Sequence, residues 1–124
     1  MINPKTILRG SVWLIDLDPV VGHEQAKRRP CVVVSMDDYN QGYAKLVAIL
    51  PITSRHRNLI WCLPIPSLEG GLHKQSYVIC DQVRSLSLER IASKCLGIVS
   101  EATLGKIEKR LAKFFAISPT SFSE

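Results

Sequence analysis

Hydrophobic and polar positions alternate along several short stretches of the chain, a pattern that predicts half-buried β-strands. Residues 11–17 alternate in this way, and Asp18-Pro19 marks their end. Residues 31–34 are apolar throughout and predict a central strand covered on both faces. Pro30 is expected only at the opening of that strand, because proline has no N–H to donate to the ladder.

The middle of the chain contains further apolar runs that predict strands. Pro51 and Pro64 lie inside two of them and favour edges or bulges at those points. The polar link 54–58 joins the apolar runs 45–53 and 59–65 and is typical of a hairpin. Residues 37–42 and 67–74 are rich in turn formers. The expected strands cover residues 45–53, 59–65, 75–83 and, more briefly, 96–99.

One amphipathic helix is predicted over residues 101–116, with Ser100 as its N-cap. A shorter helical piece is expected over 88–93, capped by Ser87. Many short strands followed by one helix predict a mainly β fold: a small barrel or strongly curved antiparallel sheet with an open face that the C-terminal helix covers. The apolar face of that helix carries Leu104, Ile107, Leu111, Phe114 and Phe115.

Length and composition predict one domain that spans residues 1–124, with a core over about 9–117. The chain has 124 residues, of which 46% are hydrophobic, enough for one compact core. Residues 1–10 lack the apolar run of a signal peptide, and no stretch is apolar for long enough to cross a bilayer. We therefore expect a cytoplasmic protein without membrane contact.

The net charge and the spacing of the cysteines and histidines limit the kinds of ligand that we expect the chain to bind. The net charge of +5 favours an anionic partner, although ordinary soluble proteins also reach such values. The cysteines form no C-x-x-C pair, which predicts free core thiols in a reducing compartment. The histidines are not spaced as metal ligands usually are, so we expect no metal and no cofactor. The cysteines are Cys31, Cys62, Cys80 and Cys95, and the histidines are His23, His56 and His73.

Four motifs in order resemble the MazF/PemK family of toxin–antitoxin ribonucleases, over nearly the whole chain. Four dispersed matches at compatible spacings are far more specific than any one alone. They are RGSVWLIDLDPVVGHEQAKRRP (9–30), SMDDYN (35–40), LPITS (50–54) and CDQVRSL (80–86).

The resemblance implies an SH3-like barrel with a C-terminal helix, a homodimer with its RNA groove near the subunit interface, and cleavage of single-stranded RNA at a short motif. It also implies silencing by a cognate antitoxin, for which we expect an acidic, disordered segment that covers the basic groove. RNA supplies its own nucleophile, the 2′-hydroxyl, so no metal is needed and the expected ends are a 2′,3′-cyclic phosphate and a 5′-hydroxyl.

Two other functions stay open. A related toxin family is thought to share this barrel and to poison DNA gyrase through protein contact, without any need for the residues of an RNA-cutting site. A nucleic-acid-binding module that lacks catalysis would instead bind RNA in a salt-sensitive way without cutting it.

Arg29 matches the family's catalytic arginine, and its forked guanidinium suits charge stabilisation and donation to the leaving oxygen. Without the resemblance, Lys27, Arg28 and Arg29 would be read as a solvated basic turn. Thr53 matches the threonine that pairs with this arginine in the family, where its hydroxyl donates to a phosphate oxygen. Its alternative role is that of a strand residue that only packs.

His23 and Glu24 are the candidates for the proton acceptor, because both precede the basic run in the same loop. A solvent-facing loop position is an equal alternative for each. Asp81 is expected in an apolar strand, where it would need a cationic partner such as Arg84 or Arg29. In some relatives the matching aspartate acts together with an arginine two residues earlier, but here that position is Ile79.

The remaining RNA contacts are expected from the same motifs and from the loops beside them. Loop residues flanking the groove are Arg55, His56, Arg57 and Lys74, and the aromatic side chains available for stacking on bases are Tyr39, Tyr43 and Trp61. The predicted RNA-binding residues are Gln25, Lys27, Arg28, Ser54, Arg55, Asp81, Gln82 and Arg84.

Overall fold

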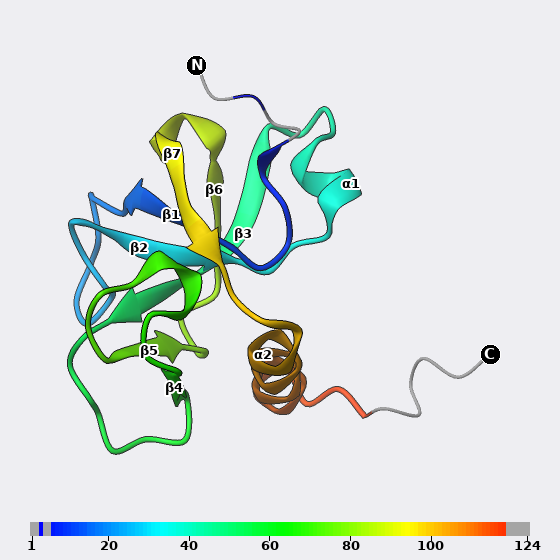
Figure 1. Cartoon of the computed structure of the whole chain (residues 1–124). Coiled ribbons are helices and arrows are strands. Elements are labelled where there is room, and N and C mark those ends of the chain that lie inside the picture. Colours follow the sequence, from blue (N-terminus) through cyan, green and yellow to red (C-terminus); the bar gives the residue numbers. More distant parts are fainter. Residues whose placement is uncertain (1–2, 4–5, 119–124) are drawn as a thin grey trace.

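The computed structural model describes residue 3 and residues 6–118 of the chain. Over these residues the chain is mainly β, with one long helix at the C-terminal end (Figure 1). The elements are β1 (Ser11–Asp16), β2 (Arg28–Val33), α1 (Asp37–Asn40), β3 (Leu46–Thr53), β4 (Cys62–Ile65), η2 (Glu69–Gly71), β5 (Ser76–Ile79), β6 (Arg84–Ser87), η3 (Leu88–Arg90), β7 (Ile91–Ile98) and α2 (Glu101–Phe114).

The strands form an antiparallel sheet in the order β4-β5-β3-β2-β1-β7, with β6 also paired to β3. β3 changes partner along its length: its first half pairs with β6 and its last two residues, Ile52 and Thr53, pair with β5. This exchange bends the sheet, which stays open with β4 and β7 at the ends of the path. The prediction of a curved antiparallel sheet with a C-terminal helix is confirmed.

Side chains of β1 and β2 alternate between two core clusters, one on each face of the sheet. Trp13 and Cys31 belong to one cluster, whereas their neighbours Val12 and Val32 belong to the other. All four side chains are at most 1% exposed. The prediction of a doubly covered strand over residues 31–34 is confirmed for residues 31–33, where β2 ends.

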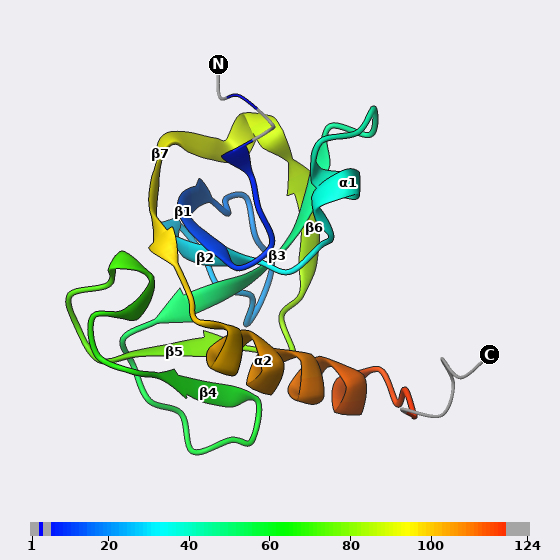
Figure 2. The ribbon, with the colours of Figure 1, turned by 45° about the vertical axis from the view of Figure 1, so that its right-hand side comes forward.

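Helix α2 covers part of the second cluster and lies along β4 and β5 (Figure 2). The hydroxyl of Ser100 accepts a hydrogen bond from the Thr103 N–H at 3.1 Å, which confirms the predicted N-cap. Ile107 is fully buried and packs with Leu63 and Val78. Burial of a side chain of this size contributes about 1.5–3 kcal/mol, so α2 is an integral part of the fold.

Three prolines lie inside strands, and two of them, Pro30 and Pro51, occupy positions that differ from expectation. Pro30 pairs with Leu14 of β1, and β3 begins to pair with β2 only at Cys31, so the side of Pro30 that lacks a donor has no β3 neighbour. Pro51 lies inside the central strand β3, where the partner on one side changes from β6 to β5. The prediction of an edge or a bulge is wrong for Pro51, which lies in an inner strand with no register shift against β2, but the predicted edge is confirmed for Pro64 in the terminal strand β4.

The expected hairpin between residues 45–53 and 59–65 is wrong. β5 lies between β3 and β4 and pairs with both, with Val78 opposite Ile52 on one side and Leu63 on the other. β5 is paired on both sides and buries the β-branched side chains of Val78 and Ile79. The polar link 54–58 gave no sign that a third strand would lie between the two runs that it joins.

Three element boundaries also differ from expectation. The strand expected over 75–83 ends at Ile79 and is followed by a turn, and the short strand expected over 96–99 is the end of the longer β7. The helical piece expected over 88–93 is the single turn η3, capped as predicted by the Ser87 hydroxyl, which accepts from the Glu89 N–H. The rest of that segment joins β7.

All four cysteines are free, and Cys31, Cys62 and Cys80 are buried. Burial raises the pKa of the Cys31 thiol to about 12, an effect that nearby Arg29 and Arg84 reduce. Burial likewise raises the pKa of Cys80 to about 12, with Arg110 opposing the change and Asp81 adding to it. Both thiols are therefore protonated packing groups at neutral pH. None of the described helices has the length and apolar character needed to span a membrane.

Candidate functional site

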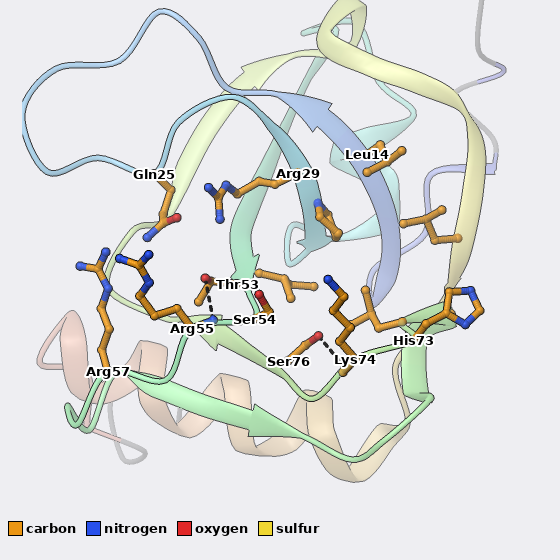
Figure 3. Close-up of a pocket in the computed structure, with 15 residues that line it drawn as sticks. Leu14, Gln25, Arg29, Thr53, Ser54, Arg55, Arg57, His73, Lys74 and Ser76 are labelled. Carbon is orange, nitrogen blue, oxygen red and sulfur yellow. Dashed lines mark hydrogen bonds between the residues drawn. The ribbon is translucent and has the colours of Figure 1, made fainter.

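A cavity of about 740 Å³ opens where the start of β2, the end of β3 and the loop before β5 meet (Figure 3). Its floor is apolar and includes Leu14, Ile52 and Leu96. Four cationic side chains line it and no carboxylate does, an arrangement whose charge is complementary to that of an anion. The polar and charged lining consists of Gln25, Arg29, Thr53, Ser54, Arg55, Arg57, His73, Lys74 and Ser76.

Arg29 reaches into this cavity from β2. Its Nε donates a hydrogen bond to the Ala26 carbonyl oxygen at 3.0 Å, which fixes the plane of the guanidinium. Within the part of the chain that the structure describes, no hydrogen bond involves its two terminal nitrogens. Those nitrogens point toward Gln25 and Thr53, and a phosphate oxygen is a natural acceptor for each.

Thr53 is the last residue of β3, where Ile52 and Thr53 pair with β5. Its hydroxyl oxygen accepts a hydrogen bond from the Arg55 N–H at 3.1 Å. Because the oxygen accepts from the backbone, the hydroxyl proton is available to an acceptor in the cavity. The same bond turns the chain so that Ser54, Arg55 and Thr53 all face the cavity (Figure 3).

The loop between β1 and β2 forms the upper wall. Gln25 is only 8% exposed, and its side chain points toward the guanidinium groups of Arg29 and Arg55 (Figure 3). At the base of this loop Leu17 N–H donates to the Lys27 carbonyl at 3.0 Å, and Lys27 N–H donates to Asp18 Oδ1 at 3.0 Å. These bonds tie the two ends of the loop together.

His23 and Glu24 lie outside the cavity. Both are exposed, and Glu24 Oε1 accepts from the Val21 N–H at 2.6 Å, which stabilises the turn at the tip of the loop. Lys27 and Arg28 line a separate surface depression together with Asp16, Asp18 and Arg90. The basic run therefore divides: Arg29 faces the cavity and its two predecessors do not.

Asp81, Gln82 and Arg84 line a smaller neighbouring cavity of about 230 Å³, which shares Gln25 with the first. The expected ion pair of Asp81 with Arg84 or Arg29 is wrong, since Arg9–Glu108 is the one salt bridge among the described residues. Asp81 lies in a half-exposed turn after β5. Arg84 instead donates from Nη1 to the Leu17 carbonyl at 2.7 Å.

Sequence reasoning missed His73 and Ser76 as lining residues. His73 lies in the loop between β4 and β5, and Ser76 begins β5 directly after it. The loop reaches the cavity because its backbone packs directly on β7: a Cβ on Gly97 would lie 2.5 Å from the Gly70 carbonyl carbon. The signal was the pair Gly70-Gly71 together with Gly97. The His73 ring lies at the edge of the cavity and points away from Arg29 (Figure 3).

The aromatic side chains considered for base stacking lie elsewhere, since none lines the cavity. Trp61 packs edge-on against Phe114 with ring centroids 5.5 Å apart, and Tyr43 is fully exposed. No three His, Cys, Asp or Glu side chains gather anywhere in residue 3 and residues 6–118, so the described chain offers no ready set of metal ligands.

Known proteins resemble this chain in sequence. Residues 8–115 match the family described as PemK-like, MazF-like toxin of type II toxin–antitoxin system. Endoribonuclease PemK of Escherichia coli is 32% identical over 105 residues, which cover 84% of this chain and 78% of that protein. Endoribonuclease MazF9 of Mycobacterium tuberculosis is 33% identical over 111 residues, which cover 83% of this chain and 91% of that protein.

Solved structures resemble its fold. The crystal structure of MazF from Deinococcus radiodurans has a TM-score of 0.75 at 28% identity and covers 88% of this chain and 94% of that one. A structure of MazE–MazF from the same organism has a TM-score of 0.73 at 27% identity, with 90% and 96% covered. The family match spans β1 to α2 and includes both strands that carry Arg29 and Thr53. The chain belongs to the PemK-like, MazF-like toxins of type II toxin–antitoxin systems.

Proposed function

We propose that this chain is an endoribonuclease that cuts single-stranded RNA at a short motif, with Arg29 and Thr53 as its catalytic pair. One observation carries the proposal: these two residues, from separate sequence motifs and separate strands, line the same cationic cavity, with their free donors available to one ligand. A phosphodiester is the anion that fits this donor set. The endoribonuclease names of the PemK and MazF9 relatives support the same activity.

In the proposed reaction the 2′-hydroxyl oxygen attacks the adjacent phosphorus atom and the bond from phosphorus to the 5′-oxygen breaks. The 2′-hydroxyl proton passes to a base and Arg29 gives a proton to the leaving 5′-oxygen, which leaves a 2′,3′-cyclic phosphate and a 5′-hydroxyl. Arg29 holds the phosphate oxygens and stabilises the charge that builds on them, and the Thr53 hydroxyl donates a hydrogen bond to one of them. The chemistry proposed here needs protein donors and one protein base, and the four cations that line the cavity are suited to supply the donors.

The proton acceptor is proposed to come from the β1–β2 loop, as His23 or Glu24. In the described conformation both lie outside the cavity, so either one acts only after RNA draws the loop inward. Separate His23→Gln and Glu24→Gln variants identify the acceptor. Only loss of the acceptor removes the acidic limb of the pH–rate profile, over which the cleavage rate rises as the acceptor loses its proton.

RNA contacts are proposed for two groups of residues. Gln25, Ser54 and Arg55, together with Arg57 and Lys74, line the cavity and bind the nucleotides at the scissile bond. Lys27 and Arg28 face the neighbouring depression and contact phosphates farther along the strand.

A homodimer and a cognate antitoxin are proposed as partners. The related MazF of Deinococcus radiodurans has been solved together with MazE, and the cationic cavity described above suits an acidic segment. Sedimentation at micromolar concentration tests the dimer. Competition between the antitoxin's acidic segment and RNA tests the second partner, and unchanged RNA affinity would contradict it.

The activity is tested by incubating the purified protein with a varied pool of single-stranded RNA in the presence of EDTA. We expect cutting that persists with EDTA and 5′-hydroxyl ends that share a short motif when sequenced. Cutting that stops with EDTA contradicts metal independence alone. No cutting together with inhibited supercoiling by DNA gyrase would favour the gyrase-poisoning alternative, and salt-sensitive RNA binding without cutting would favour a binding module.

A further inference from the structure

Gln82 lies outside the cavity that holds Arg29, yet its side chain is hydrogen-bonded to the wall of that cavity. Gln82 Oε1 accepts from the backbone N–H of Gln25 at 2.8 Å. Gln82 is half-buried and belongs to the turn between β5 and β6, far along the sequence from the β1–β2 loop. The bond therefore joins two loops that no strand pairing connects directly.

A short path runs from this bond to the guanidinium of Arg29. Gln82 accepts from the backbone N–H of Gln25. The next residue, Ala26, accepts through its carbonyl oxygen from Arg29 Nε at 3.0 Å. In the described part of the chain, these two hydrogen bonds are the ones that hold the backbone polar groups of residues 25 and 26. A displacement of residue 25 is thus transmitted to the plane of the guanidinium.

The surrounding bonds hold the base of the loop but not this stretch. Leu17 is bonded to Lys27 and to Arg84, and Asp18 accepts from Lys27, so the loop ends are fixed where β1 and β2 begin to pair. Gln25 and Ala26 lie beyond that pairing, which starts at Asp16 opposite Arg28. Gln82 supplies the anchor that the ladder does not.

We infer that Gln82 is a positioning residue for Arg29, acting through the Gln25–Ala26 backbone rather than by contact with RNA. The inference rests on the proposed function, because its consequence is measured as RNA cleavage. The transition state needs the guanidinium in one orientation, and a misplacement of about 1 Å at such a site lowers a rate by about 100-fold. Loss of the hydrogen bond from Gln25 to Gln82 should therefore lower the rate of the cleavage step and leave the affinity for uncleaved RNA unchanged.

The test compares Gln82→Leu, which removes the acceptor, with Gln82→Glu, which keeps an acceptor oxygen at the same distance along the side chain. Gln41→Leu is the matched control, since Gln41 is exposed at the end of α1, away from the cavity. Three quantities are measured: the single-turnover cleavage rate, the Kd for RNA with a 2′-deoxy nucleotide at the cleavage site, and hydrogen exchange of the Gln25 amide.

We expect Gln82→Leu to cut about 10- to 100-fold more slowly with a Kd within about twofold of wild type, and its Gln25 amide to exchange faster. Gln82→Glu should recover most of the rate and the slow exchange, and Gln41→Leu should match wild type. A Gln82→Leu rate equal to wild type, a Kd that weakens as much as the rate, or no recovery in Gln82→Glu would each overturn the inference. Failure of the wild-type protein to cut any RNA would instead overturn the proposed function, and this role with it.

Discussion

The Nε of Arg29 donates to the Ala26 carbonyl three residues earlier, at 3.0 Å, and so leaves both terminal nitrogens of the guanidinium directed across the cavity. One nitrogen of the fork orients the side chain and the other two are available to the ligand. This arrangement suits an arginine that binds a phosphate, because arginine stays protonated and acts as a hydrogen-bond donor rather than as a base.

Thr53→Val removes the hydroxyl while nearly conserving shape. The variant loses the donor proposed for the phosphate and the acceptor for the Arg55 N–H. We expect a fall of about 100-fold in the cleavage rate, the size seen when one donor to a developing charge is removed. Thr53→Ser, which keeps the hydroxyl, should retain most activity in the same single-turnover assay. Equal rates for the valine and serine variants would show that the hydroxyl takes no part.

Arg57→Gln should reduce the electrostatic part of RNA binding. Arg57 lines the cavity and is exposed, so we assign it a phosphate contact rather than a catalytic one. The slope of log Kd against log salt should fall by about 0.7, the value for one phosphate of a single strand. Lys109→Gln is the matched control, because Lys109 lies exposed on α2 and does not line the cavity. If both variants change the slope alike, the cavity has no special part in RNA binding.

Gly97→Ala and Gly105→Ala should have opposite effects on stability. A methyl group at Gly97 would meet the Gly70 carbonyl carbon at 2.5 Å, whereas nothing lies within 4 Å of the same position at Gly105. We expect Gly97→Ala to destabilise the fold by about 1–3 kcal/mol and Gly105→Ala, inside helix α2, to stabilise it by up to about 1 kcal/mol. Urea unfolding measures both changes. A Gly97→Ala variant as stable as wild type would contradict the close packing of the β4–β5 loop on β7.

Alkaline pH should weaken the fold through two core thiols. The pKa of Cys31 and that of Cys80 are each raised from 9.0 to about 12, so the folded state favours the neutral thiol. This stabilisation is complete below about pH 9 and is lost as the pH rises toward 12, by up to about 1.4 kcal/mol per pH unit for each thiol.

Urea unfolding of wild type and of the double variant Cys31→Ala, Cys80→Ala, in reductant from pH 8 to pH 11, checks this expectation. The double variant is less stable at pH 8 because it loses packed atoms, but its free energy of unfolding should fall less steeply above pH 9. Parallel slopes for the two proteins would show that these thiols do not carry the alkaline loss.

The local pattern of the sequence predicted the elements that depend on local rules. The Ser100 cap, the amphipathic α2 and the doubly covered β2 follow from capping and periodicity. The pairing of β5 between β3 and β4 does not, because the order of strands in a sheet depends on contacts between segments that are distant in sequence.

The residues of the candidate site were likewise predicted only in part. Arg29 and Thr53 were predicted through motif resemblance, and the cavity brings them together. His73 and Ser76 were missed because the position of the loop that leads into β5 depends on contact between glycines that are distant in sequence. The partner of Asp81 was wrongly predicted because the sequence did not reveal that β5 ends at Ile79 and leaves the carboxylate in a half-exposed turn.

The central claim is that Arg29 carries the chemistry and its neighbour Arg28 does not, although both are arginines of one basic run. The direct measurement is the single-turnover cleavage rate of RNA by Arg29→Lys and Arg28→Lys, each of which keeps the positive charge and loses the fork. Arg29 lines the cavity, and Arg28 faces the depression beside it. The account predicts a loss of about 100-fold or more for Arg29→Lys and a rate within about threefold of wild type for Arg28→Lys. Equal rates for the two variants, or a larger loss for Arg28→Lys, would contradict it.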